Sequence, residues 1–202
     1  VAVELGAGWG PWLVVAAVAA ARCGIRDVRL VGVEGSAAHC GFMRQHFRDN
    51  GLDPDAHRLL HGVAAAEDGT VEFPVEPDPA ADYGATVAAE DPLLQRVRGA
   101  TAAVRAYSLP TLLAPFDRVD LVHIDIQGSE ADVVLAGRAV LREKVRRVVI
   151  GTHGRAIEQA LLAELSAQGW LLEADQACRY GPYGAGLALA VDGCQVWRNP
   201  RV

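Results

Sequence analysis

The stretch VAVELGAGWG, residues 1–10, runs directly into PWLVVAAVAAAR, residues 11–22. An apolar segment followed by three closely spaced glycines and a second apolar run predicts a buried strand, a tight turn and a helix. Pro11 suits the first helical position, because its fixed φ is helical and the N–H that it lacks would have no partner there. Glycine lets the turn approach a ligand closely, and the first N–H groups of the helix are expected to face polar groups of that ligand.

The spacing of these glycines narrows the kind of site. Gly6, Gly8 and Gly10 form the pattern G-x-G-x-G, whereas a dinucleotide-binding turn has G-x-G-x-x-G. Taken alone, the pattern also fits a turn that serves only the fold. The ends of the later strands have to decide between the two interpretations.

The composition bounds the possible functions. The chain has 202 residues, about half of them apolar, and a net charge of −6. This length suits one domain over residues 1–202 with a sizeable core. The acidic balance does not favour a nucleic-acid partner, so a small-molecule acceptor is expected. No uncharged apolar run reaches about 18 residues, so no membrane span is expected.

The cysteines and the first residues of the chain indicate where in the cell the protein is expected. The four cysteines have no C-x-x-C spacing, which favours reduced thiols over a disulfide framework or a zinc site. The chain opens inside a predicted strand, so we expect its natural N-terminus to be missing. With no signal peptide evident, a cytoplasmic location is expected, and the Ala-, Val-, Gly- and Arg-rich composition suggests a bacterial source.

Beyond the first helix, apolar strands alternate with helical patterns. Strands are predicted at 28–33, 57–63, 70–75, 104–107, 119–125, 145–151 and 170–174, and helices at 36–50, 108–114, 129–137 and 155–168. Ser129 and Asp132 resemble a capping box. Asp192-Gly193, between 186–191 and 195–198, predicts a terminal hairpin. The order indicates an α/β fold: an open, mostly parallel seven-stranded sheet with an antiparallel C-terminal edge hairpin.

Candidate binding residues fall at the carboxyl ends of these strands, where ligands of open α/β sheets bind. They are Gly6–Gly10, Glu34, Gly62–Ala64, Asp125 and His153. Glu34 occupies the place where an adenosine-binding fold puts a carboxylate on the ribose hydroxyls; alternatively, it is a solvent-exposed loop acid. Small residues at 62–64 would let an adenine ring lie against the backbone. The convergence of separate positions on one edge predicts a single site.

Residues 76–103 differ from the rest of the chain. They lack a periodic pattern and are rich in proline, acids and alanine. A long irregular segment within a domain is typically a lid, a binding insertion or a disordered loop. We expect this variable insertion to shape the acceptor pocket.

Several stretches together resemble the FkbM family of S-adenosylmethionine-dependent methyltransferases, and G-x-G-x-G is the form of the glycine turn in S-adenosylmethionine-binding domains. The matching stretches are VELGAGWG (3–10), GVEGS (32–36), HGVAAAEDGTVEF (61–73), DLVHIDIQGSEADVVLAG (120–137), VVIGTHGRAIEQALLAELSAQGW (148–170) and DGCQVWRNP (192–200). The most specific part, DLVHIDIQGSE, is similar to the family's DxxKIDVEGxE. The chain departs from the family at His123 for Lys, at Gln127 for Glu, and at GTHG (151–154), where many members carry an acid and a histidine.

The resemblance implies a Rossmann-like class I methyltransferase fold. It also implies methyl transfer from S-adenosylmethionine to a hydroxyl of a small molecule, a sugar or a natural product during its biosynthesis. The residues implied to bind the cofactor are Glu4, Gly6, Ala7, Gly8, Glu34, Gly35, Gly62, Val63 and Asp125.

His153 and Asp125 are the candidate catalytic residues. An imidazole, with a reference pKa of about 6.5, suits proton removal near neutral pH, so His153 would be the general base. Asp125 would orient the imidazole, hold the cofactor amino group or contact the acceptor. Alternatively, His153 only caps helix 155–168 or bonds a backbone carbonyl.

A second mechanism has a divalent metal, Mg²⁺ or Mn²⁺, held by Asp125 and His153, with Glu130 as a further ligand. The sequence shows no complete ligand set. His123 shares a strand face with Asp125, and we expect it to be a core histidine rather than a ligand.

Two other function classes stay open. A nicotinamide-dependent oxidoreductase fits the strand, turn and acid, but not the glycine spacing, and Lys144 is the only lysine available for a catalytic Tyr–Lys pair. A non-catalytic cofactor-binding module would keep the same fold. Calorimetric titration with each cofactor separates the first from a methyltransferase, and turnover on a panel of hydroxyl compounds separates the second.

Overall fold

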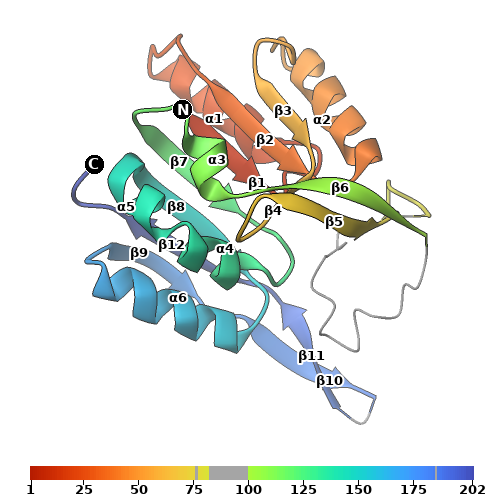
Figure 1. Ribbon diagram of the computed structural model, residues 1–202, viewed down its shortest axis with the longest axis vertical. Helices are drawn as coiled ribbons and strands as arrows, with labels where there is room; N and C mark the ends of the chain where they lie inside the picture. The colour runs from red at the N-terminus through yellow and green to blue at the C-terminus, as the bar shows by residue number, and fades with distance from the viewer. Residues whose placement is uncertain (76, 82–99, 185) are drawn as a thin grey trace.

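The computed structural model of the chain describes residues 1–75, 77–81, 100–184 and 186–202. Most of the predicted insertion, 76–103, lies outside these described residues, and its last residues, from Thr101 on, belong to a strand. The ribbon in Figure 1 shows a twisted central sheet with helices on both faces, and a smaller sheet across the end of some of its strands.

The central sheet has seven strands in the order β3-β2-β1-β7-β8-β12-β9. They are β1 (Ala2–Leu5), β2 (Leu30–Glu34), β3 (Arg58–His61), β7 (Val119–Ile124), β8 (Val145–Thr152), β9 (Leu171–Gln176) and β12 (Gly193–Arg198). Strands β3, β2, β1, β7 and β8 are parallel to one another, whereas β12 is antiparallel to β8 and β9. The predicted α/β class with a mostly parallel seven-stranded sheet is confirmed.

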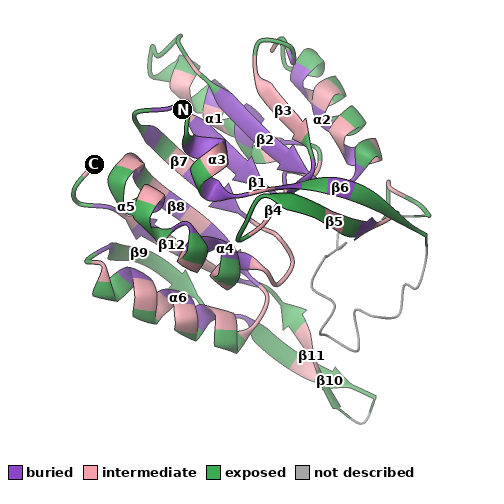
Figure 2. Cartoon of the chain, viewed as in Figure 1, coloured by how far each residue is buried: buried purple, intermediate pink, exposed green. Residues whose placement is uncertain are grey.

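Alternating side chains divide the core into two layers. The helices are α1 (Pro11–Arg22), α2 (Ala37–Asp49), α3 (Leu109–Leu113), α4 (Glu130–Ala136), α5 (Arg138–Lys144) and α6 (Arg155–Ala167). Val3 and Leu5 pack with residues of α3 to α6, and Ala2 packs with residues of α1 and α2. Figure 2 shows β1 and β2 buried along their whole length, as expected for parallel strands covered on both faces.

The predicted terminal hairpin is wrong in its pairing. Strand β11 (Gly186–Val191) pairs with β10 (Arg179–Tyr183) in a two-stranded sheet, while β12 lies between β8 and β9. Every second residue of β12, including Gln195 and Trp197, is buried, whereas no described residue of β11 is. Because β12 has an inward-facing side and β11 does not, β12 enters the central sheet and β11 stays outside it.

The smaller sheet comprises β4 (Val63–Ala64), β5 (Gly69–Pro74) and β6 (Thr101–Tyr107), with β6 in the middle. Val63, Phe73 and Val104 form its own buried cluster. Since β4 follows directly after β3, this sheet lies beside the carboxyl ends of the central strands (Figure 1).

The structure also tests the predicted start of the helix that follows β7. The capping box at Ser129 is wrong, because the Ser129 side chain makes no capping hydrogen bond.

The four cysteines are free thiols, as predicted. Among the residues described, no helix combines the length and apolar character that a membrane crossing requires.

Candidate active site

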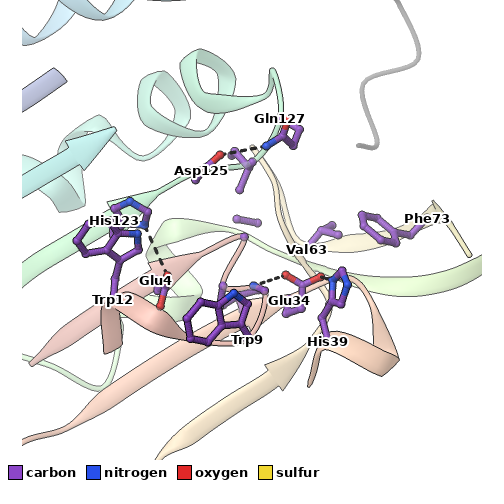
Figure 3. Close-up of a pocket in the computed structure, with 18 residues that line it drawn as sticks. Glu4, Trp9, Trp12, Glu34, His39, Val63, Phe73, His123, Asp125 and Gln127 are labelled. Carbon is purple, nitrogen blue, oxygen red and sulfur yellow. Dashed lines mark hydrogen bonds and ion pairs between the residues drawn. The ribbon is translucent and has the colours of Figure 1, made fainter. Parts of the chain in front are cut away.

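A cavity of about 250 Å³ opens at the carboxyl ends of β1, β2 and β7, with β4 and β5 beside it (Figure 3). Every residue predicted to bind the cofactor lines this cavity. Its lining consists of Glu4, Gly6, Ala7, Gly8, Trp9, Trp12, Val33, Glu34, Gly35, His39, Gly62, Val63, Ala64, Phe73, His123, Asp125, Ile126 and Gln127. The structure therefore brings together positions separated by more than a hundred residues in the chain.

The glycine turn is required by packing as well as by the cavity. Gly6, Gly8 and Gly10 all have positive φ, which favours glycine. A Cβ on Gly6 would lie 1.8 Å from the carbonyl oxygen of Asp125, at the end of the neighbouring strand. The N–H groups of Gly6 and Ala7 both donate to the carbonyl of Val33 at 3.0 Å. The turn is thus tied to both neighbouring strands.

Glu34 joins the glycine turn to the start of α2. One carboxylate oxygen accepts a hydrogen bond from the N–H of Gly8 at 2.7 Å, and the other accepts one from the N–H of Ser36 at 2.8 Å. The side chain is buried, so the alternative of an exposed loop acid is wrong. A carboxylate has about four acceptor positions, which leaves capacity on the cavity side for the hydroxyls of a ligand.

The wall residues that were not predicted from the sequence include Trp12, His39 and Phe73. The His39 ring lies 3.6 Å from Glu34 and 2.8 Å from the carbonyl of Pro79, so it connects the cavity to residues 77–81. Phe73 approaches closely because Gly35 has no side chain; a Cβ there would lie 2.6 Å from the ring. These contacts join segments distant in the chain, and no local pattern marks them.

The Glu4 side chain caps the amino end of helix α1. Its carboxyl group accepts hydrogen bonds from the N–H groups of Leu13, at 3.2 Å, and of Trp12. The expectation that these first helical N–H groups face a ligand is therefore wrong. The side-chain atoms of Glu4 and His123 approach to 3.8 Å (Figure 3).

Burial favours the uncharged form of both partners of this pair. Burial raises the pKa of Glu4 to about 8, and burial lowers the pKa of His123 to about 4. Both shifts oppose an ion pair between the two side chains, although they lie close together. His123 is buried, but it lines the cavity, and its Nδ1 has no hydrogen-bond partner among the residues described, so the prediction of a satisfied core histidine is only partly correct.

The Glu4→Gln variant is expected to gain stability over the natural chain as the pH rises. The folded protein holds the Glu4 proton up to about pH 8, whereas the unfolded chain releases it near pH 4.5. Between these values the natural chain loses up to about 1.4 kcal/mol of unfolding free energy per pH unit, and glutamine removes that loss. Urea unfolding of both proteins at pH 5 and pH 8 measures how the difference between their unfolding free energies changes with pH. A difference that stays the same at both pH values would contradict a protonated Glu4.

Asp125, Glu130 and His153 lie close together beside the cavity, and of the three only Asp125 lines it. Nδ1 of His153 lies 2.7 Å from Oε1 of Glu130, and Nε2 lies 3.4 Å from Oδ1 of Asp125. Asp125 has room because Gly151 lies beside it on β8; a Cβ at Gly151 would be 3.3 Å from its carboxyl carbon. His153 contacts Glu130 and faces Asp125, and α6 has no side-chain cap, so the alternative in which His153 only caps this helix is wrong.

Asp125 and His153 differ in access to the cavity. The Asp125 side chain is 43% exposed and lines the cavity, whereas that of His153 is 9% exposed and lies behind it. Burial opposes the imidazolium, but the Glu130 hydrogen bond and the Asp125 and Asp192 carboxylates outweigh it and raise the pKa of His153. Burial raises the pKa of Asp125, although His153 counteracts part of this.

Comparison with known proteins identifies the family. The model of the FkbM methyltransferase domain matches residues 6–171. The chain belongs to the FkbM methyltransferase family. A relative of this FkbM protein from Jannaschia sp. (strain CCS1), named "Putative methyltransferase", is 34% identical over 201 residues, which cover 98% of this chain and 71% of the relative.

Solved structures agree with the fold of this FkbM protein. Methyltransferase FkbM from Methylobacillus flagellatus KT has a TM-score of 0.59 at 14% identity, over 97% of this chain and 42% of that one. Precorrin-6y C5,15-methyltransferase from Geobacter metallireducens GS-15 has a TM-score of 0.51 at 12% identity, over 97% and 76%. These likenesses show the class I Rossmann-like methyltransferase fold, and together with the family they support methyl transfer as the reaction class.

Proposed function

We propose that this FkbM protein transfers a methyl group from S-adenosylmethionine to a hydroxyl of a small molecule, a sugar or a natural product. One observation carries the proposal: a single cavity connects the Glu34 carboxylate with the Asp125 carboxylate (Figure 3). The first, at the end of β2, is suited to bind ribose hydroxyls. The second directly follows β7, on the other side of β1, and His153 lies behind it.

The residues around Glu34 fit the adenosine part of the cofactor. Glu34 is held rigidly by two backbone N–H groups and keeps acceptor capacity for ribose hydroxyls. Val63, Ala64 and Phe73 supply an apolar wall of the cavity, on which an adenine ring would lie. The glycine turn and Asp125 would then border the methionine part, whose amino group is a natural partner for the Asp125 carboxylate.

When bound, S-adenosylmethionine supplies a methyl group on a positively charged sulfur. Methyl transfer forms a carbon–oxygen bond as the carbon–sulfur bond breaks, and the hydroxyl proton must leave. The chain contributes mainly by holding the two reactants in line. We place the activation of this hydroxyl at Asp125 and His153; help with proton removal typically contributes about 10²–10⁴-fold.

The His153→Ala variant tests this placement. We expect kcat for methyl transfer to fall by about 10²-fold or more, while the dissociation constant of the cofactor, measured by calorimetry, stays within about twofold. His153 lies behind Asp125 and does not line the cavity, so it contributes little to cofactor binding. As the matched control, His57→Ala removes a half-buried histidine at the amino end of β3, away from the cavity.

Two results would contradict the proposal. Unchanged kcat in His153→Ala would remove His153 from the chemistry. Cofactor binding without turnover on any hydroxyl compound in a broad panel would instead favour the non-catalytic module. No contact in the described residues favours a nicotinamide oxidoreductase over these alternatives.

A further inference from the structure

The groups around His153 form an unusual concentration of negative charge. Ligand atoms of Asp125, Glu130 and His153 all lie within 4.8 Å of one another. A third carboxylate, that of Asp192 in the turn between β11 and β12, lies 3.9 Å from Nε2 of His153. Three carboxylates thus surround one imidazole at the edge of the cavity. Acidic groups alone would not identify a binding site. Two further observations point to one.

The first observation is that buried polar atoms in this cluster lack hydrogen-bond partners. Among the residues described, neither Nε2 of His153 nor Oε2 of Glu130 has one. Glu130 is completely buried, and the His153 side chain is 9% exposed. An unsatisfied buried polar atom destabilises a protein by about 1–3 kcal/mol. Nε2 faces Asp125 at 3.4 Å, which is too long for a good hydrogen bond.

The second observation is that the same atoms have the spacing of two ligands on one ion. Ligand atoms about 2.1 Å from an ion and about 90–110° apart lie about 3.0–3.4 Å from each other. The distance from Nε2 of His153 to Oδ1 of Asp125 agrees with this range. The atoms therefore need little rearrangement to bind an ion between them.

Glu130 orients the imidazole for this role. Its Oε1 accepts hydrogen bonds from the N–H groups of Ile126, at 3.3 Å, and Gly128, at 3.0 Å, on either side of Gln127, whose φ is 51°. The same oxygen lies 2.7 Å from Nδ1 of His153. A histidine that binds a metal through one nitrogen usually donates the other N–H to a carboxylate. With the Nδ1 proton directed at Glu130, Nε2 is left as the ligand.

We propose that Asp125 and His153 bind a divalent cation at this edge of the cavity, with Asp192 as a further ligand and Glu130 fixing the imidazole. Carboxylate and imidazole ligands suit Mn²⁺ or a related divalent ion. The role of the ion rests on the proposed function: it would bind the acceptor oxygen and lower the pKa of that hydroxyl, which then releases its proton to water. The ion would replace a free imidazole as the activating group.

Metal binding can be measured without turnover. After treatment with chelator and its removal, the protein is titrated with Mn²⁺ while electron paramagnetic resonance records the free ion. We expect one saturable site per chain, lost in both Asp125→Asn and His153→Ala, and about 10- to 100-fold weaker in Glu130→Gln. Asp49→Asn, which removes an exposed carboxylate on α2, is the matched control and should bind normally.

The possible outcomes test the metal site and the proposed methyl transfer independently. No saturable binding up to 1 mM Mn²⁺ (about the weak limit of specific sites), or binding unchanged in both variants, would overturn the site. Full methyl transfer in excess chelator would overturn its catalytic role and leave His153 as a metal-free base. Mn²⁺ binding with no methyl transfer on any hydroxyl compound would retain the site and reject the function. His153→Gln, with unfolding monitored, guards against misfolding of His153→Ala.

Discussion

Gly6→Ala is expected to reduce the free energy of unfolding by at least about 3 kcal/mol. A Cβ at this position would lie 1.8 Å from the carbonyl oxygen of Asp125 and 2.8 Å from its carbonyl carbon. That carbonyl cannot easily move, because the Asp125 N–H donates to Leu5 at 2.9 Å and so holds the end of β7 against β1. The positive φ of 71° adds strain of its own. Urea unfolding measures the loss.

Gly24→Ala is the matched control for Gly6→Ala. Gly24 has φ of 77°, but a Cβ there would meet no atom within 4 Å. The substitution therefore adds only the strain of a positive φ, about 1 kcal/mol. The difference between the two variants isolates the collision with β7. Equal losses in both would show that Gly6 is needed only for its backbone conformation.

Glu34→Ala is expected to weaken S-adenosylmethionine binding about 10- to 150-fold, equivalent to about 1.5–3 kcal/mol for hydrogen bonds to a charged group. The variant loses the acceptor for the ribose hydroxyls and also leaves the N–H groups of Gly8 and Ser36 without their carboxylate partner. Both effects act on the cavity wall. Isothermal titration calorimetry with the cofactor measures the change.

Two further variants make the Glu34 result specific. Glu34→Gln keeps the shape and one acceptor oxygen but removes the charge, so its loss should be smaller than that of alanine. Glu67→Ala removes an exposed carboxylate outside the cavity and should bind normally. If Glu34→Ala remained folded and bound the cofactor as tightly as Glu67→Ala, Glu34 would not contact the ribose.

Most of the cavity wall was predictable because it follows from local sequence and strand direction. A glycine turn after β1, an acid after β2 and an aspartate after β7 each lie at the carboxyl end of a parallel strand. Parallel strands place these ends along one edge, so the residues meet without further information. The same argument places His153, which follows β8, near Asp125.

The C-terminal pairing was not predictable, because a local turn pattern does not determine which strands pair. Asp192-Gly193 resembles a hairpin turn, but the chain pairs β11 with β10 and sends β12 into the central sheet. Burial of Gln195 and Trp197 decides the outcome. A turn pattern describes four residues, whereas strand pairing depends on which strand has an apolar face for the core.

By itself, the sequence determined the class of fold, the edge of the sheet that carries the site and those cavity residues that follow the ends of the strands, because all three depend on the order of strands and turns. Only the tertiary structure decided what each acidic and basic side chain does there. Glu4 caps α1, Glu130 holds His153, and Asp125 lies between His153 and the cavity. These roles depend on burial and on distances of a few ångströms between separate strands and helices, and no spacing along the chain encodes them.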